Sequence, residues 1–260
     1  MNLLQVLLGC LTGLLVGLSG VGGGALMTPL LLLLGVAPLQ AVGTDLWMAA
    51  ITKVFAARIH HSRGLIDWQV VRRLWWGSLT ASAMTLLWMK LRPVDASAVG
   101  LLRNLVSGAV LVTAAGFAIQ KPLHSLGRHL RVSAGERFKA LQGPLTVLAG
   151  ALIGALVTLT SVGAGALGTV FLVYLYPLRL TPARLIATDI AHGIPLALFA
   201  GLGHLLIGDV NFALLATLLL GSIPGVVAGS LLSARLPQPL LRLVLAVLLA
   251  AIGFELLRHN

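Results

Sequence analysis

Charged residues are scarce in this 260-residue chain. They make up 10% of it, against 58% hydrophobic residues. A soluble domain carries about 25% charged residues, so too few polar side chains are present to cover a water-facing surface. The apolar residues form long blocks, which a lipid bilayer solvates. The sequence therefore predicts an all-α polytopic membrane protein that contacts the lipid bilayer over most of its surface.

Cysteine is nearly absent as well. The single cysteine, Cys10, lies inside the first apolar block and cannot form a disulfide within the chain. No Cys/His cluster has metal-ligand spacing, and there is no Walker A pattern. We therefore expect no metal site and no cofactor, and an ATP-driven role would need a partner chain. A basic n-region and a small-residue cleavage site are also missing, so we expect no cleaved signal peptide.

Ten apolar segments alternate with polar stretches. We predict them at residues 3–19, 25–36, 41–61, 68–90, 97–119, 141–159, 165–177, 182–206, 210–234 and 239–257. This order predicts an N-terminal repeat (1–120), a basic cytoplasmic linker (121–140) and a C-terminal repeat (141–260). Segments 25–36 and 165–177 are short for a bilayer, so they either cross fully or belong to broken or re-entrant segments.

The two halves are similar in sequence. With residue 38 aligned on residue 182, 12 of 56 positions are identical, including Pro38/Pro182, Thr44/Thr188 and Asp45/Asp189. Two unrelated leucine-rich stretches would match at leucine rather than at Asp, Thr and Pro. We infer that the chain arose by duplication.

The distribution of Lys and Arg predicts the topology. If the linker is cytoplasmic, 13 of the 18 basic residues lie in inner loops and four in outer loops, as the positive-inside rule requires. Equivalent loops of the repeats then face opposite sides, and both termini lie outside. Such inverted repeats are typical of secondary transporters. We interpret the net charge of +11 as a topology signal in the inner membrane, with no nucleic acid as partner.

A glycine cluster after the first segment is the first candidate site. It recurs in the second half, where Ser161-Val162-Gly163-Ala164-Gly165 corresponds to Gly20-Val21-Gly22-Gly23-Gly24. Helices broken at matching positions point to a transporter's substrate site, and the N–H groups of a following helix favour an anion. Close helix packing is the alternative. We predict that substrate is bound by Ser19, Gly22, Gly23, Gly24, Ser161, Gly163 and Gly165.

The repeated Thr-Asp pair is the second candidate. We predict that Thr44 and Thr188 bind substrate and that Asp45 and Asp189 couple an ion, because ionised residues within a membrane are costly and tend to be functional. An Asp at the start of a segment is alternatively an N-cap.

Three further polar residues lie in the same segments. Lys53 follows Asp45 by eight residues and shares its face, so it either couples ions or extends to the interface. His192 follows Asp189 by three residues and is either ion-coupling or a packing residue. We predict that His204 lies at the interface.

The sequence resembles the sulfite exporter TauE/SafE family of membrane transporters over essentially its whole length. The residues that carry the resemblance are Gly13, Gly17, Gly20-Val-Gly-Gly-Gly24, Pro29, Gly35, Gly43-Thr44 and Gly64-Leu-Ile-Asp67-Trp68. The resemblance implies ion-coupled transport of a small anion, often sulfur-containing, such as sulfite or a sulfonate. It also leads us to expect neutral residues where Asp45 and Asp189 stand, which makes these two carboxylates candidate proton carriers.

We therefore expect a secondary transporter, not an enzyme, with a small anion and a proton or sodium ion as its partners. A passive anion channel or a membrane subunit of a complex is the alternative. An intramembrane serine protease is a further one, because Gly17-Leu18-Ser19-Gly20 fits a G-x-S-G pattern; the second repeat has no such pattern. The sequence leaves the substrate, the transport direction and a homo-oligomeric state open.

Overall fold

A computed structural model describes residues 3–19, 24–59, 64–91, 96–133, 135–207, 210–233 and 238–258. Within these residues the chain forms ten helices and no strand, which confirms the predicted all-α fold. The helices are α1 Leu3–Ser19, α2 Gly24–Leu33, α3 Pro38–Ile59, α4 Trp68–Leu91, α5 Ala96–Ser133, α6 Gly135–Thr160, α7 Ala166–Leu175, α8 Pro182–Ile207, α9 Phe212–Leu232 and α10 Gln238–Arg258.

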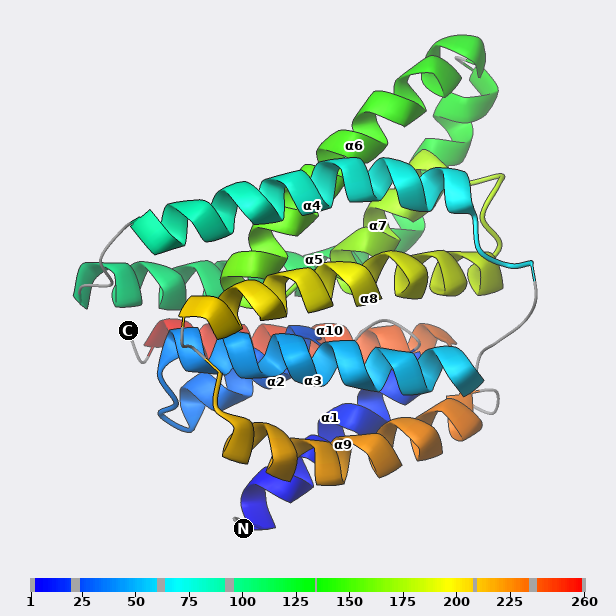
Figure 1. Cartoon of the computed structure of the whole chain (residues 1–260). Helices are drawn as coiled ribbons and strands as arrows, with labels where there is room; N and C mark the ends of the chain where they lie inside the picture. Colours follow the sequence, from blue (N-terminus) through cyan, green and yellow to red (C-terminus); the bar gives the residue numbers. More distant parts are fainter. Residues whose placement is uncertain are drawn as a thin grey trace.

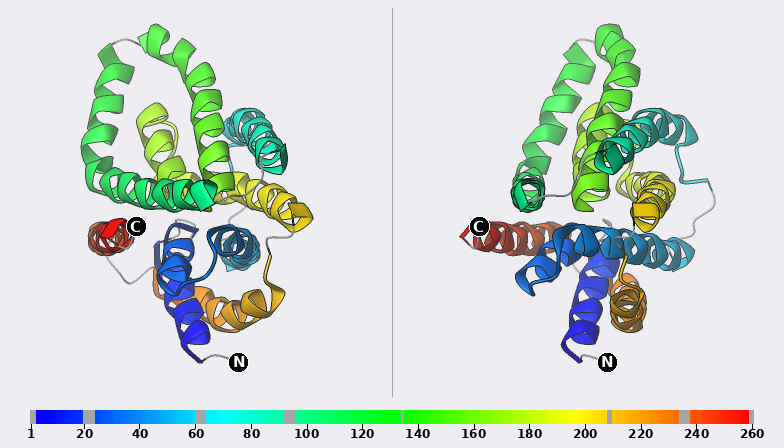
Figure 2. Two further views of the ribbon diagram at one scale, coloured as in Figure 1. Left: turned by 90° about the vertical axis from the view of Figure 1, so that its left-hand side faces the viewer. Right: turned by 60° about the vertical axis from the view of Figure 1, so that its left-hand side comes forward.

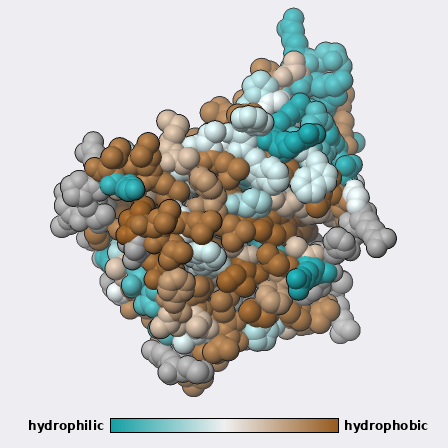
Figure 3. Space-filling view, in the orientation of Figure 1, coloured by the Kyte–Doolittle hydropathy of each residue, from teal (hydrophilic) through white to brown (hydrophobic). Residues whose placement is uncertain are grey.

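Five of these helices, α5, α6, α8, α9 and α10, are long and apolar enough to cross a membrane. Helices α3 and α4 have similar lengths but carry three charged residues each. The ten residues of α2 or of α7 rise only about 15 Å, half the thickness of a bilayer core. Apolar residues cover most of the face in Figure 3, and hydrophilic residues gather toward one corner of it.

Helices α6 and α7 form a hairpin. The Gln142 side chain in α6 donates a hydrogen bond to the carbonyl of Leu175 at 2.5 Å, and Thr146 Oγ1 lies 2.8 Å from the Tyr176 hydroxyl. The end of α7 is therefore close to the beginning of α6, and the two helices enter and leave the protein at the same end.

Most long helices run roughly side by side (Figure 1). The end of α3 and the starts of α4 and α8 lie at one end of the molecule, and the end of α10 lies at the other. The residues predicted as a linker are helical: α5 continues to Ser133 and α6 begins at Gly135. Together they form a hairpin that projects from the body (Figure 2).

The two halves are interleaved. Helix α1 packs on α9 and α6 packs on α4; α2 packs on α10 and α7 on α5; and α3 packs on its own counterpart, α8. When each helix is replaced by its counterpart in the other repeat, α1–α9 becomes α6–α4, α2–α10 becomes α7–α5, and α3–α8 becomes itself. Close backbone contacts follow the same rule. A β-carbon would overlap a backbone oxygen at four glycines that form two equivalent pairs, among others: Gly9 against Leu218, Gly13 against Ser222, Gly150 against Leu74 and Gly154 against Ser78. Small residues allow such backbone approach between membrane helices.

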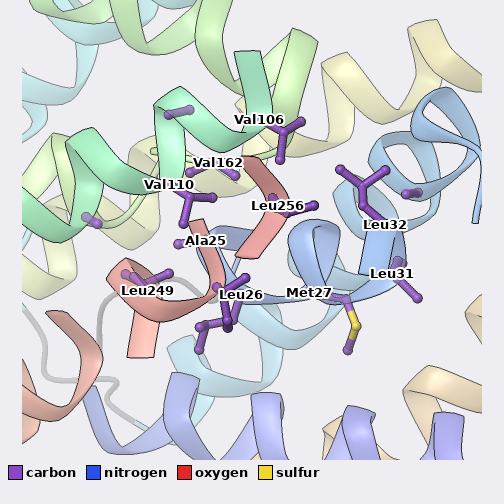
Figure 4. Packing of buried hydrophobic residues seen from close by; sticks show 14 of the residues in the cluster. Ala25, Leu26, Met27, Leu31, Leu32, Val106, Val110, Val162, Leu249 and Leu256 are labelled. Carbon is purple, nitrogen blue, oxygen red and sulfur yellow. The ribbon is translucent and has the colours of Figure 1, made fainter. Parts of the chain in front are cut away.

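The largest apolar core surrounds the short helix α2. Leu26 and Leu31 of α2 lie among Val106 of α5 and Leu249 of α10 (Figure 4), and Val162 of the α6–α7 connection belongs to the same cluster. This packing holds a half-length helix and a non-helical connection inside the protein. Irregular backbone at such depth is tolerated only where protein or a cavity surrounds it.

Candidate functional site

The helix break predicted in the second repeat lies between α6 and α7. Residues 161–165 are buried throughout and separate Thr160 from Ala166. Ser161 has a φ of 58° and Gly163 a φ of 113°, a conformation that non-glycine residues rarely adopt. The Ser161 hydroxyl is buried without a hydrogen-bond partner in the described part of the chain. Strain and an unsatisfied donor on one residue are typical of functional positions.

The equivalent break in the first repeat is only partly described. Gly22 and Gly23 lie outside the described residues, and Gly24 begins α2. Ser19 is the last residue of α1, is 7% exposed, and donates a hydrogen bond to the carbonyl of Val16 at 3.3 Å. Gly165 is the N-cap of α7 and makes no side-chain capping bond.

Asp45 is fully buried in α3 and is held by α2. Its Oδ2 accepts hydrogen bonds from Thr28 Oγ1 at 2.7 Å and from the Thr28 backbone N–H at 3.2 Å. The Ser161 hydroxyl lies near the same carboxylate but does not meet hydrogen-bond geometry. The structure thus brings Asp45 and the α6–α7 break together from opposite repeats.

The N-cap interpretation of the two aspartates is wrong. Helices α3 and α8 begin seven residues earlier, at Pro38 and Pro182, so Asp45 and Asp189 lie two turns inside their helices. The apolar pattern had placed the start of one segment too late, because the turn that precedes Thr44 contains few strongly apolar residues. Neither carboxylate therefore caps the helix that carries it.

Asp189 faces Lys53 across the contact between α8 and α3. Both side chains are almost fully buried, at 1% and 2% exposed, and they interact electrostatically. Lys53 lies against Gly193, one turn beyond Asp189 on α8. Lys53 therefore does not extend to the interface. Neither its ammonium nor either Asp189 oxygen makes a hydrogen bond within the described residues, so the pair is close but not locked together.

Gly168 of α7 also lies against Asp189. A β-carbon at Gly168 would lie 2.7 Å from Asp189 Oδ1, so only glycine fits there. His192, on the next turn of α8, is fully buried and its Nε2 lies 3.0 Å from Ser78 Oγ of α4. The carbonyl of His192 accepts a hydrogen bond from the Trp75 indole. This cluster gathers side chains from α3, α4, α7 and α8.

The two threonines occupy equivalent positions at opposite ends of the α3–α8 pair. Thr44 Oγ1 accepts a hydrogen bond from the backbone N–H of Asn211, and Thr188 Oγ1 accepts one from that of Asp67, each at 3.1 Å. Asn211 and Asp67 are themselves equivalent in the repeat. Each threonine therefore ties the interior of one helix to the loop that precedes a helix of the other repeat.

Sequence reasoning missed an ion-pair cluster at the basic end of the molecule, which we call the latch: Asp67, Arg179 and Arg184. Arg179 donates to both Asp67 oxygens, from Nε at 2.6 Å and from Nη2 at 2.8 Å. Arg184 Nη2 lies 3.8 Å from Asp67 Oδ2. The sequence did carry a signal for this cluster. Both arginines lie in the stretch Tyr176–Arg184, whose first-repeat counterpart is neutral, and Asp67 occupies the position of Asn211 in the other repeat.

His204 corrects another expectation. It is fully buried rather than interfacial, and its Nε2 lies 2.8 Å from the carbonyl of Thr158. The prediction took the end of the apolar segment as the end of the bilayer and therefore placed His204 at the interface. In the structure α6 covers His204 instead.

Comparison with known proteins identifies relatives over the whole chain. The family model described as "Sulfite exporter TauE/SafE" matches residues 5–256. The "Probable membrane transporter protein YjnA" of Bacillus subtilis (strain 168) is 35% identical over 265 residues, covering 99% of this chain and 100% of that protein. The "Probable membrane transporter protein YunE" of the same organism is 23% identical, over 97% of this chain and 96% of its own. No solved structure matches.

Proposed function

The chain belongs to the sulfite exporter TauE/SafE family, and we propose that it is a proton-coupled secondary transporter. Its substrate is a small sulfur-containing anion such as sulfite or a sulfonate, which it moves across the cytoplasmic membrane by alternating access. Lys53 and Asp189 carry this proposal, as opposite charges buried together without hydrogen bonds. A buried charge without complete partners is costly, and in membrane helices such residues mark transport pathways.

The coupling follows from competition for Lys53. While Asp189 is ionised it neutralises the ammonium, and an arriving anion gains little from Lys53. Protonation of Asp189 releases the ammonium, which then attracts the anion with little screening in a medium of low dielectric constant. When the proton leaves, the carboxylate recaptures Lys53 and the anion is displaced. Anion and proton therefore bind and leave together.

The neighbouring residues have supporting roles in this proposal. The Ser161 hydroxyl and the backbone of residues 161–165 supply neutral donors to the anion, as interrupted helices do in other transporters. Asp45, tied to Thr28, fixes the position of that break. His192 holds α8 against α4 through Ser78. Ser19 bonds within its own helix, which favours a packing role over that of a protease nucleophile.

Alternating access requires two halves that move relative to each other. We propose that residues 1–120 and 141–260 are inverted repeats, with residues 121–140 at the cytoplasmic side and both termini outside. The exchange symmetry of the helix contacts supports this, as does the clustering of Arg179 and Arg184 at one end. The two halves then rock about the α3–α8 contact.

Flux measurements on the purified protein in liposomes test the proposal. Sulfite uptake should rise with an imposed pH gradient, and Asp189→Asn should abolish the response to that gradient. Asp45→Asn is the matched control, since it alters the equivalent carboxylate that Thr28 already holds, and it should keep the gradient response. An equal loss of the gradient response in Asp45→Asn and Asp189→Asn would assign proton coupling to both carboxylates rather than to Asp189 alone. Absence of sulfite flux in the native protein would refute the substrate assignment.

A further inference from the structure

A cavity of about 320 Å³ lies away from the α3–α8 contact, where α5, α8 and α10 meet the connection between α7 and α8. The polar residues that line it are Gln120, Lys121, His124, Thr181 and Arg242; apolar side chains such as Leu178 and Leu185 complete the wall. Its volume is within the range of small-molecule sites.

The charges of this cavity have one sign. Lys121, His124 and Arg242 line it, and none of its lining residues is acidic. Arg242 is half-buried in the first turns of the apolar helix α10 and has no ion-pair or hydrogen-bond partner in the described part of the chain. An arginine in such surroundings is costly, and its planar group suits the oxygens of a phosphate or sulfonate.

The buried side chain of Gln120 independently indicates that the cavity binds a ligand. It is 3% exposed, and neither its amide nitrogen nor its amide oxygen has a hydrogen-bond partner within the described residues. Buried polar groups are rarely left unsatisfied, and an unmade bond of this kind is unfavourable. A ligand with oxygen acceptors in the cavity would engage the amide of Gln120.

The start of α8 adds a third contribution. Thr181 and Pro182 line the cavity at the N-terminus of this 26-residue helix, and Thr181 Oγ1 accepts a hydrogen bond from the N–H of Arg184 at 3.4 Å. The N-terminus of a helix carries partial positive charge and favours anions. The cavity thus combines a helix N-terminus, three basic side chains and an unsatisfied buried amide.

We propose that this cavity binds a tetrahedral oxyanion group, a phosphate, sulfate or sulfonate, at a site separate from the α3–α8 contact. The group belongs either to a soluble anion or to the headgroup of an anionic lipid. This site does not depend on the proposed transport mechanism, because no residue of the Lys53–Asp189 pair takes part in it.

Equilibrium binding of radiolabelled inorganic phosphate to the full-length protein, purified in detergent and stripped of lipid, tests the proposal. We expect saturable binding of one phosphate per chain. Arg242→Gln should weaken it at least tenfold, and Gln120→Glu should weaken it by a similar factor through charge repulsion. Arg258→Gln, which removes an arginine from the opposite end of α10, should bind as the native protein does.

Competition with dioctanoyl phosphatidylglycerol distinguishes the two sources of the group. Displacement of phosphate by micromolar lipid would assign the site to a headgroup, and no displacement would assign it to a soluble anion. Lack of saturable binding of either probe, or unchanged binding in Arg242→Gln, would overturn the proposal. Sulfite flux in liposomes is measured separately, so a failed transport assay leaves this result unaffected.

Discussion

Removal of the Arg179 guanidinium should open the basic end of the protein. Arg179 makes two short charge-assisted bonds to Asp67, which is 3% exposed, and a third bond to the Gln69 side chain at 2.9 Å. These bonds join the loop before α4 to the loop before α8. They can form only when the two loops are together, so they stabilise the conformation in which that end is closed.

The size of the effect follows from burial. Exposed ion pairs contribute about 0–1 kcal/mol, whereas loss of one partner of a buried pair costs about 3–5 kcal/mol. The Arg179 side chain is 42% exposed and that of Asp67 is 3% exposed, so the pair lies between these limits, at about 2 kcal/mol. Because each 1.4 kcal/mol is a factor of ten, Arg179→Ala should raise the open population about 30-fold.

Thiol labelling measures this population. Cys10 is exposed, so the background is Cys10→Ser, and the reporter is Thr188→Cys, at a fully buried position behind the latch. A charged, membrane-impermeant reagent should label the introduced thiol about 30-fold faster when Arg179→Ala is added. Asp67→Asn should act in the same direction. Arg72→Ala is the control, because within the described residues Arg72 bonds the carbonyl of Trp68 on its own helix and no residue of another helix.

Labelling within threefold of the background rate in Arg179→Ala would refute the reasoning. It would mean that packing of α7 and α8, rather than the ion pairs, keeps this end closed. A rise of the same size in Arg72→Ala would instead indicate a general effect of lost positive charge.

Three other perturbations have defined outcomes. Lys53→Met and Asp189→Asn should each destabilise the protein by about 3–5 kcal/mol, and the double variant should be more stable than either, because it leaves no unpaired buried charge. Gly13→Val should remove folded protein from the membrane fraction, because the β-carbon would overlap the backbone of α9. Thr28→Val should cost about 1–3 kcal/mol, since the buried Asp45 carboxyl loses its shortest hydrogen bond. Apparent melting temperatures and expression levels measure these effects.

Each of these predictions has an outcome that would contradict it. Gly100→Val places the same side chain in open space on α5 and should express normally; equal loss of protein would contradict the packing argument. A double variant of Lys53 and Asp189 less stable than both single variants would show that the two charges do not compensate each other. A Thr28→Val protein as stable as the native one would make its bond to Asp45 dispensable.

The helices were predictable because they depend on local composition. A run of apolar residues long enough for the bilayer fixes each segment, and the observed bounds of α1, α8 and α10 agree with the predicted ones to within a residue. The break at residues 161–165 was also predictable, since glycine and serine interrupt an apolar run there. The starts of α3 and α8 at prolines follow the preference of Pro for the first helical turn.

The pairings were not predictable in the same way, because they join distant parts of the chain. Nothing local indicates that Lys53 faces Asp189 instead of the interface, or that Arg179 bonds Asp67. The internal repeat could have predicted some of these pairings. Once Thr44 and Thr188 are recognised as equivalent, one threonine–loop bond implies the other. A pair such as Lys53–Asp189 cannot be predicted from the repeat in this way, because Lys53 has no charged counterpart in the other half.

These asymmetric pairs explain how a duplicated frame could transport in a preferred direction. Two identical inverted repeats would give the inward-open and outward-open states the same energy, because exchanging the repeats converts one state into the other. In this chain Lys53 and His192 correspond to Ala197 and Met48, so the charged cluster belongs to one side of the frame. Among the described residues the latch is likewise found at the basic end alone, where Asp67 occupies the position that Asn211 has in the other repeat. In the transport cycle proposed above, the shared contacts would give the frame two related states, and the unshared charges would determine which state is favoured and which ions change that preference.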